Sequence, residues 1–558
     1  MRFICIMFEK WLLKVLLVCA LLVYARGWFL PVMDVDSAQY ASISAEMART
    51  NQFLEVKSRN QDYLDKPPLL FWVSAVGFKI FGTTEFAFRF LPFLFLLAGF
   101  YAVYRLGILL YSKAVAFWAV VFFSTAQAIF LFAHDLRTDT LLTACLCLAI
   151  WQLAEYRKSN SWPSFIWGFV FLGLAMLAKG PLGLMIPVLA FGAEALLNRQ
   201  WGFIFKWQWL LGLLVVLLVL WPMLWGLYHQ FDLQPNKTVM MPTPDGLQPR
   251  TGISGLRFYF WEQSFGRLTG ENDWKDQSGP FFFIHTLLWA FLPFSLLALA
   301  ALLWKTRFEF SSWFKGHQAD FLALMGFVLP FIAMSKSQYK LPHYIFPLLP
   351  LLSLITAQFV VERGLKYRLF LRYSSLFLVL ILHALMFVLV FAFFPGNVLW
   401  YFFPGMTLLI SFAIYYFQKD LKAWLLPLVF SGIACNLLLN YRFYPQLMAY
   451  QNGSMLGEKA LNLGANESNT AYYKEFCFSF DFTINGNPPV ISFPEHFSSA
   501  TKFIYTNSAG YRDLLEKGFQ FKEVVEMPSF PVTGLSLDFL MASKRTSQLK
   551  SYYLLILP

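Results

Sequence analysis

The chain has 558 residues, of which 58% are hydrophobic and only 14% are charged. A soluble protein of this length needs more charge to cover its surface, so the composition excludes an ordinary soluble enzyme and indicates a polytopic α-helical membrane protein. The formal net charge is +12, but the Lys and Arg residues are scattered in small groups between apolar runs. That pattern is typical of cytoplasmic loops and argues against nucleic-acid binding.

Apolar stretches of membrane-spanning length predict about thirteen transmembrane helices. The first is interpreted as a retained span, because no small-residue cleavage site follows Leu30. Basic residues gather in alternate connections, which predicts a cytoplasmic N-terminus and long outer loops at 31–85 and 228–281. The predicted spans lie near 11–30, 86–104, 115–133, 139–154, 163–178, 182–197, 209–227, 282–304, 319–335, 342–361, 373–395, 399–417 and 422–440.

An odd number of spans places the tail after residue 440 outside, so we expect a membrane domain at 1–440 and an extracytoplasmic α/β domain at 441–558. Ala509 to Lys517 is predicted as a helix. The final Tyr552 to Pro558 is apolar but too short to span. Strands are predicted at Val490 to Ser492, Lys502 to Tyr505, Phe519 to Val525 and Leu537 to Ala542.

Carboxylates and a lysine frame the first outer loop. Asp34 and Asp36 open a polar segment after the first span, and Lys66 lies near its end. A carboxylate here can take a proton from an incoming hydroxyl, and a lysine at headgroup depth can neutralise a lipid phosphate. Alternatively, both acids stabilise the start of a short helix, and the lysine is an interfacial residue whose stem lies in the membrane.

Polar residues concentrate on the predicted outer side. The spans are nearly free of ionisable side chains, with Arg26, Glu194 and His383 as exceptions. A transporter would place such residues near mid-membrane, so the distribution favours a catalyst at the outer interface. A transporter or flippase of lipid-linked sugars stays as the alternative of another class. The other outer candidates are Asp139, Lys179, Glu262, Arg267, Lys340, His343 and Tyr344.

Several of these residues fall in ordered motifs over roughly residues 10 to 360. The motifs are Asp36-x-x-x-Tyr40, Asp65-Lys-Pro-Pro-Leu69, Phe81-Gly82 with Glu85 and Arg89, Arg137-Thr-Asp139-Thr140, Leu174 to Pro181, Glu262 with Phe265-Gly-Arg267, and Ser335 to Tyr344. Their order resembles the bacterial polyprenyl-phosphate-dependent type C (GT-C) glycosyltransferases, which include lipid A aminoarabinose transferases and protein O-mannosyltransferases. Ser37 and Gln39 depart from the family, which often has an acid and an arginine there. Asp34 is an alternative source of the missing carboxylate.

The resemblance implies that Asp36 is the catalytic acid of the first loop and Asp139 a second acid. The helix dipole alone would also explain Asp139 at the start of a helix. Fixed cations would stabilise the charge that develops on the leaving lipid phosphate. The residues predicted to bind the donor phosphate are Lys66, Arg267, Lys179 and Lys340, and those predicted to bind substrate are Asp34, Tyr40, Glu262, His343 and Tyr344.

The implied activity is transfer of a sugar from undecaprenyl phosphate to an envelope acceptor at the outer face of the bacterial inner membrane, with inversion. Lipid A is the leading acceptor and protein hydroxyls, as in O-mannosylation, are the alternative. No cofactor is expected. A divalent metal held by His134, His229 or His285 with acidic residues is left open, although no ligand spacing supports it.

Overall fold

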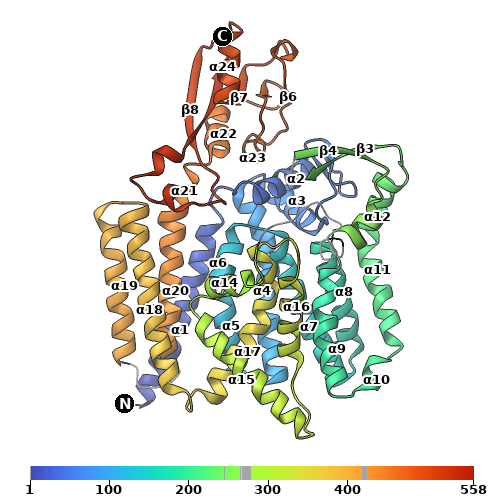
Figure 1. Cartoon of the computed structure of the whole chain (residues 1–558), viewed down its shortest axis with the longest axis vertical. Coiled ribbons are helices and arrows are strands. Elements are labelled where there is room, and N and C mark those ends of the chain that lie inside the picture. Colours follow the sequence, from blue (N-terminus) through green and yellow to red (C-terminus); the bar gives the residue numbers. More distant parts are fainter. Residues whose placement is uncertain (1, 244–245, 264–265, 267–277, 418–423) are drawn as a thin grey trace.

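The structure, a computed structural model, describes residues 2–243, 246–263, 266, 278–417 and 424–558. A bundle of long apolar helices carries a small sheet at one end, and the N-terminal end of α1 lies at the opposite end of the bundle (Figure 1). The helices of the bundle are α1 (Arg2–Gly27), α4 (Glu85–Leu110), α5 (Lys113–Ser124), α6 (Gln127–His134), α7 (Thr138–Ser159), α8 (Trp162–Lys179), α9 (Leu182–Leu197), α10 (Trp201–Ile204), α11 (Gln208–Leu227), α14 (Phe282–Ala290), α15 (Ser295–Phe314), α16 (Leu322–Ser335), α17 (Leu349–Arg363), α18 (Arg368–Val388), α19 (Val398–Phe417) and α20 (Leu426–Leu438).

All thirteen predicted spans fall on helices, but the predicted count of thirteen is not confirmed. Within the described residues, seven helices are long and apolar enough to cross a membrane, or eight if a bent pair counts as one span. Three further apolar helices, among them α9 and α16, are shorter than a full span. The charged ends of α7 lower its mean hydropathy, which is one reason why the criteria of length and composition give a smaller number.

Two predicted spans are broken inside the bundle. The stretch 115–133 divides into α5 and α6, which are bent by 54° relative to each other. The stretch 282–304 divides into α14 and α15 around Pro293. The two breaks meet, because the backbone N–H of Gln127 donates to the carbonyl of Leu292 at 2.9 Å. Each break therefore supplies a partner to a backbone group that the other break frees.

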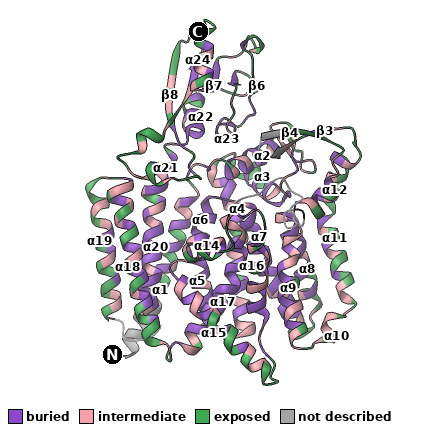
Figure 2. Ribbon diagram, in the orientation of Figure 1, coloured by how far each residue is buried: buried purple, intermediate pink, exposed green. Residues whose placement is uncertain are grey.

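The burial pattern separates a central helix from peripheral ones. In an 18-residue window of the span Pro342–Arg363, made of the short helix η3 (Pro342–Leu348) and α17, 89% of the residues are buried, whereas only 17% are buried in the corresponding window of α19. Figure 2 shows the contrast between purple central helices and the largely green and pink α19 and α11 at the two edges. An apolar helix that is exposed on most sides is the pattern expected of a lipid-facing span.

Short elements lie across the end of the bundle that faces the sheet. They are α2 (Asp36–Thr50), β1 (Lys57–Ser58), β2 (Gln61–Asp62), α3 (Leu69–Phe81), η1 (Tyr228–Asp232), β3 (Thr238–Thr243), β4 (Gly246–Thr251), α12 (Gly255–Arg257), η2 (Phe258–Glu262), η4 (Leu389–Phe393), η6 (Leu439–Phe443) and α21 (Tyr444–Met448). The β1–β2 turn has Arg59 and Asn60 at positive φ. Glu46 of α2 fixes this turn by accepting hydrogen bonds from both backbone N–H groups, at 2.9 and 3.0 Å.

The tail contains a five-stranded sheet in the order β6-β5-β7-β9-β8. Strands β6, β5 and β7 are mutually parallel, and β9 pairs antiparallel with both β7 and β8. The elements of the tail are α22 (Asn452–Asn462), β5 (Thr470–Tyr473), α23 (Phe478–Ile484), β6 (Val490–Ile491), η7 (Pro494–His496), β7 (Phe503–Asn507), α24 (Ser508–Glu516), β8 (Glu523–Ser529), α25 (Leu537–Leu540), η8 (Arg545–Gln548) and β9 (Lys550–Ile556).

The predicted helix over 509–517 is confirmed as α24, and three predicted strands overlap β6, β7 and β8. The predicted strand over Leu537 to Ala542 is wrong, because Ser536 accepts a hydrogen bond from the backbone of Phe539 and starts the helix α25. The apolar end of the chain, for which no strand was predicted, is the strand β9 beside β7.

The tail is fastened to the first loop by buried polar contacts. Arg59 pairs with Asp481 of α23, and its second terminal nitrogen donates to the carbonyl of Pro488 at 2.6 Å. Asn487 donates to Glu46 at 2.9 Å. Burial raises the pKa of Asp481 to about 6, and Arg59 offsets part of that rise. These contacts fix the tail against α2.

A second buried cluster lies in the later part of α15. The ammonium of Lys305, with no exposed surface, binds Glu309 at 2.7 Å, Asp320 at 2.8 Å and the amide oxygen of Gln358 at 2.9 Å. One lysine therefore neutralises two carboxylates and joins α15 to α17 and to the start of α16.

We expect Lys305→Met to lower the thermal unfolding midpoint of the detergent-solubilised protein. The substitution leaves the carboxylates of Glu309 and Asp320 without their cation, which costs about 3–5 kcal/mol for a buried pair. Lys315→Met, at an exposed position after the same helix, is the matched control and should leave the midpoint near that of the wild type. Equal midpoints for the two variants would contradict the assignment.

Candidate active site

A cavity of about 1680 Å³ lies between the bundle, the first loop and the tail. Small-molecule sites typically enclose about 300–1,000 Å³, so this cavity has room for two substrates together. The residues predicted as site residues that line it are Asp36, Tyr40, Lys66, Asp139, Lys179, His343 and Tyr344. The structure therefore brings together side chains from four separate parts of the sequence.

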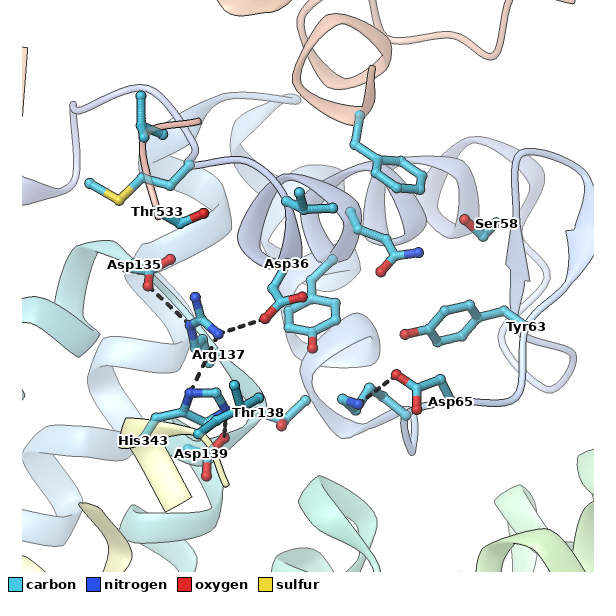
Figure 3. Close-up of a pocket in the computed structure, with 18 of the residues that line it drawn as sticks. Asp36, Ser58, Tyr63, Asp65, Asp135, Arg137, Thr138, Asp139, His343 and Thr533 are labelled. Carbon is cyan, nitrogen blue, oxygen red and sulfur yellow. Dashed lines mark hydrogen bonds and ion pairs between the residues drawn. The ribbon is translucent and has the colours of Figure 1, made fainter. Parts of the chain in front are cut away.

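Asp36 and Arg137 form the central ion pair of the cavity. Asp36 is the first residue of α2, and Arg137 directly precedes α7. The guanidinium donates to Asp36 Oδ2 at 2.6 Å and to Asp135 Oδ2 at 3.0 Å (Figure 3). Burial lowers the pKa of Arg137, but the two carboxylates raise it by more, so the pKa lies above its usual value. Arg137 is thus a permanent cation that holds Asp36 at the cavity wall.

Tyr40, one turn after Asp36 in α2, is buried and also lines the cavity. Burial, with the negative charge of Asp36 nearby, raises the pKa of Tyr40 well above 10. The phenol therefore stays protonated and can act only as a neutral donor or acceptor at physiological pH.

The charged row continues from Arg137 to Asp139 and Lys179. His343 lies between the first two, with its Nδ1 3.5 Å from Arg137 and its Nε2 3.8 Å from Asp139, as Figure 3 shows. Lys179, the last residue of α8, donates to Asp139 near the start of α7 and lies 4.4 Å from the ring centre of Tyr344. An acid at a helix N-terminus and a base at a helix C-terminus are each favoured by the helix dipole.

Lys66 lies on another wall of the cavity. Its ammonium is 2.5 Å from Asp65 Oδ2, and its side chain is 16% exposed. In Figure 3, Tyr63 and Asp65 lie to the right of Asp36, across from Asp135. Two lysines, Lys66 and Lys179, thus present positive charge to the same space, each next to a carboxylate.

Asp34 does not line the cavity. Its carboxylate accepts hydrogen bonds from the hydroxyl of Ser479 at 2.5 Å and from the backbone N–H of Ser479 at 3.1 Å. Asp34 and Asp36 therefore have different partners, and Asp34 does not take the place of the missing carboxylate beside Asp36. The binding of substrate by Asp34 is untested and stays a prediction.

The remaining predicted residues lie away from the cavity wall or outside the described part. Lys340 donates to the carbonyl of Ser278 at 3.0 Å and is not among the lining residues. Glu262 is 3.3 Å from Arg257 rather than in a described pair with Arg267, which lies outside the described residues. The roles of these residues stay predictions.

No metal site is recorded among the described residues: no three His, Cys, Asp or Glu side chains are grouped in them as ligands would be. His134 is buried, with its Nδ1 3.1 Å from the carbonyl of Phe130, and His229 lies 3.3 Å from Glu55. His285 is exposed on α14.

Two cavity residues were missed by sequence reasoning. Arg137 was part of a recognised motif but received no role, although it alternates with Asp135 and Asp139 at a helix junction. Arg59 also lines the cavity, and its partner Asp481 lies in the tail. The alternation of charge could have indicated Arg137, whereas nothing local in the sequence indicates the partner of Arg59.

Sequence comparisons relate the chain to known glycosyltransferases. A family model described as "Dolichyl-phosphate-mannose-protein mannosyltransferase" matches residues 65–225. The chain is 26% identical over 342 residues to undecaprenyl phosphate-alpha-4-amino-4-deoxy-L-arabinose arabinosyl transferase 2 of Proteus mirabilis, covering 60% of this chain and 56% of that protein. It is 27% identical over 369 residues to the corresponding transferase of Pseudomonas aeruginosa, covering 62% and 60%. The match thus spans less than two thirds of these relatives.

The fold comparison covers nearly the whole chain. The crystal structure of ArnT from Cupriavidus metallidurans bound to undecaprenyl phosphate superposes with a TM-score of 0.73 at 14% identity, over 97% of both chains. This likeness shows a shared fold. Together with the sequence matches, it confirms the predicted resemblance to the GT-C glycosyltransferases, and in particular to those of the lipid A aminoarabinose transferase type.

We expect Asp34 to contribute to the change of stability with pH. Burial raises its pKa from 3.8 to about 6, partly offset by hydrogen bonds from Ser479 and Cys477. The folded chain therefore binds this proton more tightly than the unfolded chain. The stabilisation by the protonated Asp34 carboxyl is fully present below about pH 4 and is lost as the pH rises through about 6.

Asp34→Asn should remove this dependence and keep an oxygen to accept from the N–H of Ser479. We expect the thermal midpoint of the variant to fall less between pH 5 and pH 8 than that of the wild type, as measured in detergent. Asp481 titrates in the same range in both proteins and gives a shared background. Parallel curves for variant and wild type would contradict the prediction.

Proposed function

We propose that the protein is an inner-membrane glycosyltransferase that moves a sugar from undecaprenyl phosphate to an envelope acceptor. The observation that carries the proposal is the Asp36–Arg137 ion pair on a cavity that Lys66 and Lys179 also line. The relatives named above are transferases of an undecaprenyl-phosphate-linked sugar. We further propose that the cavity faces the periplasm, where a lipid-linked donor is needed because nucleotide sugars stay in the cytoplasm.

In this proposal the lysines receive the donor phosphate. Breaking the glycosidic bond sends its electron pair to the phosphate oxygen, so negative charge grows on the polyprenyl phosphate. Lys66 and Lys179 are fixed by Asp65 and Asp139 and are largely screened from water. Charge-assisted donors held in a poorly solvated site stabilise such a developing anion without a metal ion.

Asp36 then acts on the acceptor. Arg137 occupies Oδ2, and no partner of Oδ1 is recorded among the described residues. A hydroxyl acceptor would give its proton to this oxygen while its own oxygen bonds the anomeric carbon from the face opposite the phosphate, which inverts the configuration. A phosphate acceptor is already ionised, and for it Asp36 would orient the sugar or the acceptor.

Lipid A is the proposed acceptor, because the relatives with the matching sequence are named as aminoarabinose transferases. Protein O-mannosylation is the second candidate, and the specific observation that favours it is the family model over residues 65–225, which carries that description. The two candidates share a donor class and differ in the pool of acceptor that gains mass.

We expect Asp36→Asn to reduce transfer from an undecaprenyl-phosphate-linked sugar by about 10²–10⁴-fold, the range for loss of an acid–base group. The amide keeps the shape and can still accept from Arg137, so the thermal midpoint should stay near that of the wild type. Asp538→Asn, which changes an exposed acid paired with Lys544, is the control. Nucleotide sugars should give no turnover. Full activity of Asp36→Asn would contradict the proposed role of Asp36 in transfer.

Mass spectra of lipid A and of envelope glycoproteins test the acceptor. Cells that express the wild-type protein should show a mass increase in lipid A that cells expressing Asp36→Asn lack. An increase confined to glycoproteins would instead support O-mannosylation. If neither pool differs while the purified protein consumes the donor, the proposed acceptors are both wrong.

A further inference from the structure

The segment that leads to Asp36 has no regular secondary structure. Residues 28–35 connect α1 to α2. The carbonyls of Met33 and Val35 accept from the backbone of α2, whereas those of residues 28 and 30–32 accept from side chains. Two buried side chains from distant parts of the sequence, Arg89 and Gln451, provide these partners. These hydrogen bonds also fix the position of the segment in the fold.

Arg89 of α4 is 1% exposed and binds four carbonyl oxygens. It donates to Trp28 at 3.1 Å, Leu30 at 2.5 Å, Pro31 at 3.1 Å and His134 at 2.7 Å. No ion pair of Arg89 with a carboxylate is recorded in the described part of the chain. A guanidinium carries five N–H donors in a rigid fork, so this one side chain holds two separate segments in fixed relation.

The two segments lead to the two members of the central ion pair. Pro31 lies shortly before Asp36, and His134 lies shortly before Arg137. His134 is also the last residue of α6, where the helix presents unsatisfied carbonyls that favour a cation. Arg89 thus fixes the starting points from which the carboxylate and the guanidinium reach the cavity.

Gln451 holds the same segment closer to the acid. Its amide N–H donates to the carbonyl of Val32 at 2.7 Å, and its amide oxygen accepts from the backbone N–H of Asp34 at 2.8 Å. The side chain is 3% exposed. Arg89 therefore fixes residues 28–31, and Gln451 fixes residues 32–34.

We propose that Arg89 and Gln451 are positioning residues that set the distance and orientation of Asp36 relative to Arg137. This inference rests on the proposed function and adds two residues that touch neither substrate nor the cavity. Neither residue is among those lining the cavity. Both act through the backbone of the segment that leads to Asp36.

Arg89→Lys tests the inference with the charge retained. Lysine places its donors on a single nitrogen and cannot hold both segments. We expect kcat to fall by about 10- to 100-fold, because a small misplacement of catalytic groups has effects of that order. The KM for the undecaprenyl-phosphate-linked sugar that the wild type uses should change by less than about 2-fold, because the phosphate-binding lysines are unaffected.

A double-mutant cycle with Arg137→Lys separates positioning from general loss of structure. If Arg89 acts through the ion pair, Arg89→Lys should lower kcat by less than about 3-fold in the Arg137→Lys background, whereas independent effects would multiply. Arg157→Lys is the matched control. Arg157 lies at the other end of α7, paired with Glu194 and Gln200, and its substitution should leave kcat unchanged.

Gln451→Met provides a second, milder variant if Arg89→Lys does not accumulate. It should also lower kcat with little change in KM, and again less strongly in the Arg137→Lys background. Unchanged kcat in folded variants, or an equal fold-loss in both backgrounds, would overturn the inference. The wild-type reaction is measured first, so absence of any turnover with polyprenyl donors would reject the proposed function itself and the inference with it.

Discussion

The contact on which the site depends is the ion pair between Asp36 and Arg137. It joins the start of α2 to the junction of α6 and α7, and so ties the first loop to the centre of the bundle. The Asp36 side chain is 41% exposed, and an ion pair with a solvent-exposed partner adds only about 0–1 kcal/mol to stability. The pair is therefore weak evidence for stability and stronger evidence for a geometry that the protein maintains.

The cavity is built so that each cation has a carboxylate beside it. Arg137 lies between Asp36 and Asp135, and Lys179 faces Asp139. Such pairing lets the cations persist where water is scarce before a substrate arrives. In the proposed reaction, the donor phosphate would compete with the carboxylate already beside each lysine. The site is thus preorganised in charge, and binding exchanges one ion pair for another without having to create a charge in the cavity.

Each span predicted from hydropathy falls on a helix of the bundle, because spans must satisfy their backbone groups internally and leave a strong local signal. The same signal cannot show where a span breaks. At the breaks near Thr125 and Pro293, a tertiary hydrogen bond from Gln127 to Leu292 supplies the missing backbone partners. The acids of the first loop were equally visible in the sequence, yet their different partners were not. Asp34 meets Ser479 and Asp36 meets Arg137, contacts that no local spacing encodes.

The tail and the rest of the chain also meet through contacts that no local spacing encodes. The division at residue 440 stays a prediction, but the cavity itself combines the two parts. Phe476 and Phe478 line it opposite the bundle, and the Arg59–Asp481 pair fastens that wall to the first loop. Because Asp481 is fully buried in this contact, separating the tail would leave its charge without a partner. The tail therefore belongs to the site physically, because it forms part of the wall of the cavity that Asp36 also lines.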